Sequence, residues 1–326
     1  MPPDEESTTN GSRRDHRARQ RRIWRRSLIG GLAVALLAGG TAFALTDPLR
    51  SDDGNSASRS NSGTSVPTSG AAAHTCRAAL NPDDPLRLWI GGDSLAGSLG
   101  PSLGELTGKS GIVQPIVDSR ASSGLLSRDF VNWPERGGED MFTYNPEVAV
   151  FIVGANDAKT LQDGAERDRD WRTRYSELVE EMLTVLGGNG RVVYWVGAPV
   201  MADSAYSERV KAVNEVFRDV AARHPGVVYV DAYAVFSTPD GTYAPTLPVP
   251  GGKISRVRST DGIHFTPEGG DLLAKTVFER LDPACRVTQQ AVPGVVKQTI
   301  EANGSSPVPG SRRDQSTPTT GRRTGG

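Results

Sequence analysis

Cysteine and histidine are scarce in this chain, which has two of the first and four of the second in 326 residues. The cysteines do not form a Cys-x-x-Cys motif, and no His-Glu-x-x-His motif is present. The acidic residues between 163 and 170 also lack the spacing of a calcium-binding loop. Because zinc and calcium sites usually show such patterns, we expect neither a metal nor another cofactor.

An excess of charge of one sign is also absent from the chain as a whole, since 37 basic residues are balanced by 38 acidic ones. Attraction to nucleic acid depends on a sustained excess of positive charge. We therefore do not expect nucleic acid as a partner. No internal repeat is found in the sequence either.

Positive charge is concentrated locally in residues 13–26, which contain eight arginines and one aspartate, and residues 27–45 that follow carry no charge. An apolar run of this length can cross a bilayer, with the arginines on the cytoplasmic side. We therefore expect a basic cytoplasmic leader in residues 1–26 and a transmembrane signal anchor or a signal peptide in residues 27–46. Both interpretations stay open, because residues 42–44 offer an Ala-x-Ala cleavage site.

Composition then divides the rest of the chain. Residues 47–75 are rich in Ser, Gly, Asn and Thr and predict a flexible tether. Residues 287–326 are rich in Pro, Gly, Ser, Thr and Arg and predict a disordered tail. Residues 76–286 carry the apolar pattern of one globular domain, which either N-terminal interpretation places outside the cytoplasm.

Cys76 and Cys285 lie at the two ends of this predicted domain. A disulfide between them is the simplest interpretation, because such a bond persists outside the cytoplasm and closes a long loop. The alternative is a pair of unpaired, buried thiols.

Within the domain, short runs rich in Val and Ile alternate with longer segments of helical period. We expect strands at 86–91, 112–117, 148–153, 192–196 and 227–230, and helices at 95–106, 170–186, 204–224 and 267–281. Continuous apolar strands separated by helices indicate an α/β fold, a three-layer sandwich with a flavodoxin-like parallel sheet of about five strands. In such sheets, reactive groups gather where the strands end.

Two polar motifs follow predicted strands. The sequence Gly-Gly-Asp-Ser-Leu at 91–95 places Ser94 at a strand-to-helix turn, where backbone N–H groups and the helix dipole favour negative charge. The sequence Gly-Ala-Asn-Asp at 154–157 places the amide of Asn156 where it can donate to an oxyanion. Taken alone, each motif is equally compatible with an ordinary turn.

A third motif, Asp-Gly-Ile-His at 261–264, precedes the last predicted helix. Its spacing allows one loop to present both Asp261 and His264, so that the carboxylate accepts from Nδ1 of the imidazole while Nε2 faces a serine. His264 is the one histidine well placed to act as a base. The other three fall in the leader, in the tether and at the end of a helix.

In this order, the motifs resemble the SGNH (GDSL-like) hydrolase family. Further segments resemble a bacterial SGNH subfamily known as a domain of unknown function, namely 122–125, 128–134 and 194–199. The resemblance implies the SGNH hydrolase fold, with Ser94 as nucleophile, His264 as its base and Asp261 as the group that orients the ring. It also implies an oxyanion hole formed by the N–H groups of Ser94 and Gly124 and the side chain of Asn156. The sequence departs from the family pattern before Gly124, where no clear asparagine is found.

The resemblance predicts a serine esterase or O-acyl hydrolase that forms an acyl-enzyme. Since both N-terminal interpretations export the domain, we expect an acyl ester of a cell-envelope glycan as substrate, and a location at the cell membrane, or outside the cell if the signal is cleaved. The alternatives are O-acyl transfer to a glycan and a catalytically silent glycan-binding module.

Several side chains are considered as contacts to a sugar. We expect Trp133, Trp171 and Trp195 to pack in the core or against the sheet, with stacking on a sugar as the alternative. We expect Arg256 and Arg258 to carry solvated surface charge, with hydrogen bonds to a sugar as the alternative.

Overall fold

The computed structural model describes residues 76–161 and 169–305. The predicted leader, membrane segment and tether lie outside these ranges. Within the two ranges, no helix has both the length and the apolar character that crossing a membrane requires.

Six parallel strands form the central sheet, in the order β5-β4-β3-β1-β2-β8. The strands are β1 (Leu86–Gly92), β2 (Val113–Ser119), β3 (Val148–Ile152), β4 (Val192–Val196), β5 (Val227–Val230) and β8 (Ile300–Glu301). All five residues of both β3 and β4 are buried, as expected for strands that are covered on both faces. The predicted three-layer α/β fold is therefore confirmed, with one more strand than expected.

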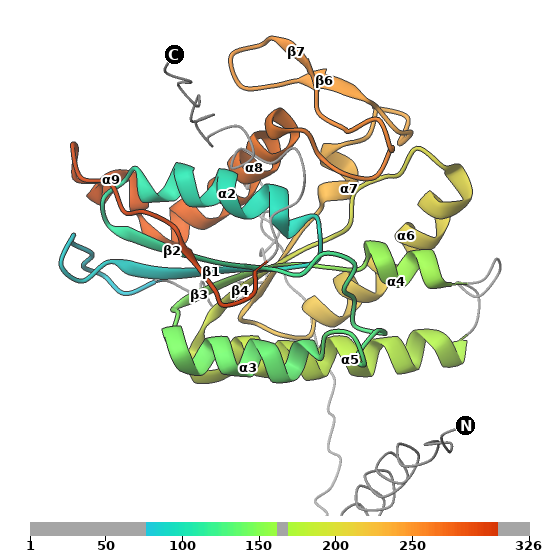
Figure 1. The fold of residues 1–326 in the computed structure, drawn as a ribbon, viewed down its shortest axis with the longest axis horizontal. Coiled ribbons are helices and arrows are strands. Elements are labelled where there is room, and N and C mark those ends of the chain that lie inside the picture. Colours follow the sequence, from blue (N-terminus) through green and yellow to red (C-terminus); the bar gives the residue numbers. More distant parts are fainter. Residues whose placement is uncertain (1–75, 162–168, 306–326) are drawn as a thin grey trace, which may run out of the picture. The chain divides into compact units, whose positions relative to one another are not determined.

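Helices cover both faces of this sheet (Figure 1). On one face, α2 (Ala96–Gly108) packs along α8 (Pro267–Cys285). On the other face, α5 (Arg169–Gly187) lies between α3 (Trp133–Tyr144) and α6 (Ser204–Ala221). Three short α-helices lie in the connections, namely α4 (Ala155–Thr160), α7 (Ala232–Val235) and α9 (Val287–Gln290), and a 3-10 helix, η2 (Gly188–Gly190), follows α5.

The helix α3 was not predicted from the sequence. Its segment contains Gly137 and Gly138 in succession, which weakens the helical signal. The structure explains the first of these glycines, because a Cβ at Gly137 would lie 2.9 Å from the terminal methyl of Met182. Gly137 thus allows α3 to approach α5 closely.

Aromatic side chains from the sheet and its helices fill part of the core. The ring of Phe151 makes edge-on contacts with Trp133 and Trp195, each with centroids 5.2 Å apart. Trp133 and Trp195 are at most 1% exposed, and Trp171 is 8% exposed. The three tryptophans are therefore core residues, and their alternative role as sugar platforms is wrong.

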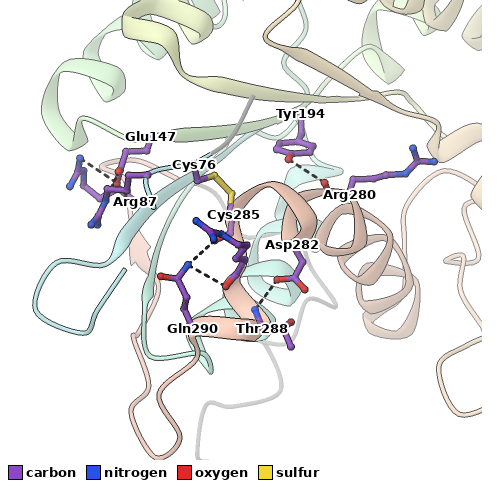
Figure 2. Close-up of a disulfide and its surroundings, with 11 residues drawn as sticks. Cys76, Arg87, Glu147, Tyr194, Arg280, Asp282, Cys285, Thr288 and Gln290 are labelled. Atoms are coloured by element: carbon purple, nitrogen blue, oxygen red, sulfur yellow. Dashed lines mark hydrogen bonds and ion pairs between the residues drawn. A yellow bond between two sulfur atoms is a disulfide. The ribbon is translucent and has the colours of Figure 1, made fainter. Parts of the chain in front are cut away.

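The predicted disulfide between Cys76 and Cys285 is present, and it joins the start of the domain to the end of α8 (Figure 2). The side chain of Gln290 donates to the carbonyl oxygen of Cys285 and accepts from the N–H of Leu80. The disulfide and Gln290 together hold both ends of the domain at one place.

The predicted disordered tail is wrong for residues 287–305, which form α9 and the edge strand β8. The strand pairs with β2, and the guanidinium of Arg120 donates to the carbonyl oxygens of Asn303 and Gly304. Composition gave the wrong prediction for this segment because the segment has no long apolar run. It is ordered instead by backbone hydrogen bonds to the edge of the sheet. The remainder of the predicted tail, 306–326, lies outside the described residues.

A small antiparallel hairpin, β6 (Thr246–Pro248) and β7 (Ile254–Arg256), stands beyond α8 in Figure 1. It leads directly into the segment that carries Asp261 and His264. The helix α8 follows this segment and starts at Pro267, with Thr266 as its N-cap.

Candidate active site

Ser94 lies in the turn between β1 and α2, at the carboxyl end of a central strand. The turn requires glycine at position 92, where φ is 143° and a Cβ would lie 1.8 Å from the carbonyl oxygen of Ile152. The next residue, Asp93, donates its backbone N–H to the same carbonyl oxygen at 3.1 Å. The start of the motif is therefore fixed against β3, and Ser94 follows it directly.

The three predicted catalytic side chains form one hydrogen-bonded chain. The Oγ atom of Ser94 lies 2.8 Å from Nε2 of His264, and Nδ1 of His264 lies 2.6 Å from Oδ2 of Asp261. This arrangement lets the imidazole accept the serine proton while the carboxylate orients the ring. The structure thus brings together residues that are 170 positions apart.

Asp261 is held by its own loop. Its Oδ1 atom accepts from the backbone N–H groups of Ile263 and His264, at 2.8 and 3.0 Å. Partial burial acts to raise the pKa of Asp261, but the hydrogen bonds from His264 and from the two backbone groups outweigh it and lower the pKa to about 2. The group is a carboxylate at neutral pH, as the orientation of a histidine base requires.

The glycine of the third motif is also required by packing. Gly262 has a φ of 72°, and a Cβ there would lie 2.4 Å from the Cβ of Ala202. The carbonyl oxygen of Gly262 accepts from the N–H of Ala202 at 3.1 Å. The segment that carries Asp261 and His264 is therefore attached to the chain that follows β4.

Asn156 and Gly124 lie on two segments that are bound to each other. The side-chain amide of Asn156 donates to the carbonyl oxygen of Ser123 at 2.8 Å. The adjacent carboxyl of Asp157 accepts from the N–H groups of Leu125 and Leu126, at 3.0 and 2.9 Å. A Cβ at Gly124 would lie 2.3 Å from Oδ1 of Asp157, so the close approach requires glycine. The two predicted oxyanion segments are thus one unit.

Charged residues hold the segment that precedes Gly124, where the family pattern is missing. Asp118 is fully buried and forms ion pairs with Arg120 at 2.6 Å and with Arg136 at 2.7 Å. The backbone N–H of Arg120 donates to the carbonyl oxygen of Gly92 at 2.8 Å. These contacts tie the segment to the turn that contains Ser94.

Asp93 is a buried carboxyl group directly beside Ser94, to which the sequence motif assigned no role. It is 0% exposed, and its Oδ1 atom accepts from the N–H of Leu95 at 2.9 Å. Burial raises the pKa of Asp93 to about 8; the nearby charge of Asp157 adds to this, while the hydrogen bond from Leu95 opposes it. The group next to Ser94 is therefore protonated at neutral pH. The one sequence feature that could have drawn attention to Asp93 is its position between Gly92 and Ser94.

No cluster of three His, Cys, Asp or Glu side chains that could hold a metal ion occurs in residues 76–161 and 169–305.

Comparison with known proteins places these motifs in a family. The model of a family described as "Protein of unknown function (DUF459)" matches residues 87–280, a range that contains Ser94, Asp261 and His264. No curated protein matches the chain significantly.

Similar solved structures include a GDSL-like lipase from Bacteroides thetaiotaomicron, with 14% identity, a TM-score of 0.43, and coverage of 61% of this chain and 88% of that one. An aryl esterase from M. smegmatis is 17% identical, with a TM-score of 0.43 and coverage of 61% and 99%. An acetyl-xylooligosaccharide esterase from Geobacillus stearmophilus is 16% identical, with a TM-score of 0.44 and coverage of 61% and 94%.

Proposed function

The chain belongs to the DUF459 family, and we propose that it is an exported serine esterase of the SGNH class. The observation that carries the proposal is the chain of hydrogen bonds from Ser94 through His264 to Asp261, with distances of 2.8 and 2.6 Å. A serine hydroxyl is a weak nucleophile near neutral pH and needs an adjacent, oriented base. His264 and Asp261 meet this requirement.

In the proposed reaction, Oγ of Ser94 attacks the acyl carbon while Nε2 of His264 takes the hydroxyl proton. The tetrahedral intermediate collapses, the bond to the alcohol oxygen breaks, and His264 returns the proton to that oxygen. Water then attacks the acyl-enzyme with His264 again as base, which releases the free acid and restores Ser94. The carboxylate of Asp261 stabilises the imidazolium in both halves.

The oxyanion would be held by the N–H groups of Ser94 and Gly124 and by the side chain of Asn156. One hydrogen of the Asn156 amide is used by the carbonyl oxygen of Ser123, and the second is available to a substrate. The protonated state of Asp93 supports this role, because a charged carboxylate beside Ser94 would oppose a developing oxyanion.

We further propose that the substrate is an O-acyl group of a cell-envelope glycan. The basic leader and apolar run that precede the domain support export, and the Cys76–Cys285 disulfide is typical of proteins outside the cytoplasm. The side chains of His264 and Asp261 are 28% and 46% exposed. Because these two side chains are accessible from solvent, an ester group attached to a large polymer could reach them.

The test uses the full chain in detergent, with p-nitrophenyl acetate and an O-acetylated wall polysaccharide as substrates. Wild-type protein should release acetate from both and react with a fluorophosphonate, whereas Ser94→Ala should do neither. Equal labelling of the Ser94→Ala variant would overturn the serine mechanism. Polysaccharide binding without acetate release would indicate a silent glycan-binding module instead, and acetylated acceptor formed in place of free acetate would indicate transfer.

A further inference from the structure

Arg258 is buried inside the domain, so the expectation that it carries solvated surface charge is wrong. It is 0% exposed and is among the largest fully buried side chains. None of the ion pairs between described residues involves it. A buried guanidinium without a carboxylate partner is unfavourable unless other groups replace water around it.

Three aromatic rings take the place of part of the water around the guanidinium of Arg258. The guanidinium carbon lies 5.5 Å from the ring centroid of Phe236, 5.2 Å from that of Tyr243 and 5.4 Å from that of Phe265. Cation–π contacts of this length stabilise a desolvated guanidinium. Burial lowers the pKa of Arg258 to about 10, so the side chain keeps its charge at neutral pH.

Backbone carbonyl groups on two different segments also take the place of water around the guanidinium. The Nη1 atom donates to the carbonyl oxygen of Val200 at 2.5 Å, in the chain that follows β4. The Nη2 atom donates to the carbonyl oxygen of Ile263 at 2.8 Å. Ile263 stands directly before His264 and supplies one of the N–H groups that hold Asp261. The guanidinium therefore connects the catalytic loop to the neighbouring strand end.

We propose that Arg258 is a positioning residue for the reaction proposed above, and that its guanidinium fixes the loop 261–264 so that Nε2 of His264 meets Oγ of Ser94. The planar fork of arginine reaches both carbonyl oxygens at once. Lysine has a single ammonium group and cannot reproduce this geometry. Methionine fills a similar space but leaves both oxygens without a donor.

The first test measures p-nitrophenyl acetate hydrolysis by the full-length Arg258→Met and Arg258→Lys variants. Displacement of a reacting group by about 1 Å lowers the rate by about 10²-fold. We therefore expect Arg258→Met to lose about 10²-fold in kcat with KM changed less than twofold, and Arg258→Lys to recover part of the loss. The matched control is Leu186→Ala, a fully buried position in the last turn of α5, at the opposite end of the sheet. It should lower the melting temperature and leave kcat unchanged.

The second test does not depend on turnover. The proton on Nδ1 of His264, which is shared with Asp261 at 2.6 Å, should give a downfield proton NMR signal that is absent in His264→Gln. This signal should move or broaden in Arg258→Met and stay in place in Leu186→Ala. A protein that shows these changes but has no esterase activity would refute the proposed function and retain the positioning role.

Two outcomes would overturn the inference. One is a folded Arg258→Met variant with wild-type kcat and an unchanged His264 signal. If Arg258→Met does not fold, Arg258→Lys decides the question, because it keeps the charge and most of the volume. Wild-type kcat and an unchanged His264 signal in Arg258→Lys would then show that the guanidinium fork does not position the loop.

Discussion

The side-chain amide of Asn156 donates to the carbonyl oxygen of Ser123 at 2.8 Å. This bond joins the residue that is expected to bind the oxyanion to the segment that carries Gly124. Substitution of Asn156 therefore removes a donor to the substrate and also loosens the other side of the oxyanion site.

We expect Asn156→Ala to lower kcat for p-nitrophenyl acetate by about 10²-fold to 10³-fold, because loss of one oxyanion donor has an effect of this size in other serine hydrolases. KM should change little, since the bond strengthens in the transition state. Steady-state kinetics checks this. Asn81→Ala, before β1 at the other end of the sheet, is the control. A fall in kcat of less than fivefold for Asn156→Ala would remove the residue from the oxyanion site.

Asp93 predicts a specific dependence of stability on pH. Its pKa is about 8 in the folded protein against an ordinary value of 3.8. A raised pKa means that the associated stability is fully present below about pH 4 and is lost as the pH rises through 8. Asp93→Asn keeps the carbonyl that accepts from Leu95 and cannot ionise, so its unfolding free energy should fall less between pH 5 and pH 8 than that of the wild type.

Chemical unfolding at several pH values measures this difference. Asp140 also has a raised pKa, about 7, caused by burial and by the charge of Asp118. Its contribution is common to both proteins and cancels in the comparison. Parallel stability curves for the two proteins would show that Asp93 does not retain its proton at neutral pH.

The Cys76–Cys285 disulfide should contribute to stability without affecting catalysis. The pair is separated by 209 residues, and loss of a native disulfide typically lowers the free energy of unfolding by about 2 to 5 kcal/mol. Cys285 lies at the end of α8, and the 19 residues of that helix separate it by about 28 Å from the helix start beside His264. The Cys76→Ser/Cys285→Ser double variant should therefore melt at a lower temperature and keep its kcat at 20 °C. A large loss of kcat in a folded variant would contradict this.

The sequence predicted the centre of the sheet and the triad for identifiable reasons. The strands β1, β3, β4 and β5 are short runs that contain mostly Leu, Val, Ile or aromatic residues, and the complete burial of β3 and β4 makes their runs conspicuous. Ser94, Asp261 and His264 stand in short motifs next to strand or helix ends, so local spacing was enough to predict that their side chains meet.

Other features depend on contacts between distant parts of the chain. Arg258 is surrounded by Phe236, Tyr243 and Phe265, none of which is next to it in the sequence. The residues next to Arg258 in the sequence therefore do not predict its burial. The strand β8 has two residues, both exposed, and is defined by its pairing with β2. Neither feature has a local hydrophobic period that sequence analysis could detect.

The C-terminal segment lies against the part of the chain that leads to Gly124. Strand β8 pairs with β2, the Oγ atom of Ser305 accepts from the N–H of Ser119 at 3.0 Å, and Arg120 donates to the carbonyl oxygens of Asn303 and Gly304. Deletion of residues 300–326 removes all of these partners and exposes the edge of β2. Since Ser119 and Arg120 precede the Gly124 segment, we expect kcat to fall by about 10-fold to 10²-fold through misplaced oxyanion donors.

The exposed edge of β2 should also make this variant more prone to aggregate. The matched control is deletion of residues 306–326, which keeps every contact named above. Hydrolysis of p-nitrophenyl acetate and light scattering should therefore distinguish the two truncations. Equal kcat values in the two proteins would mean that β2 and Arg120 hold the Gly124 segment without help from the C-terminal strand.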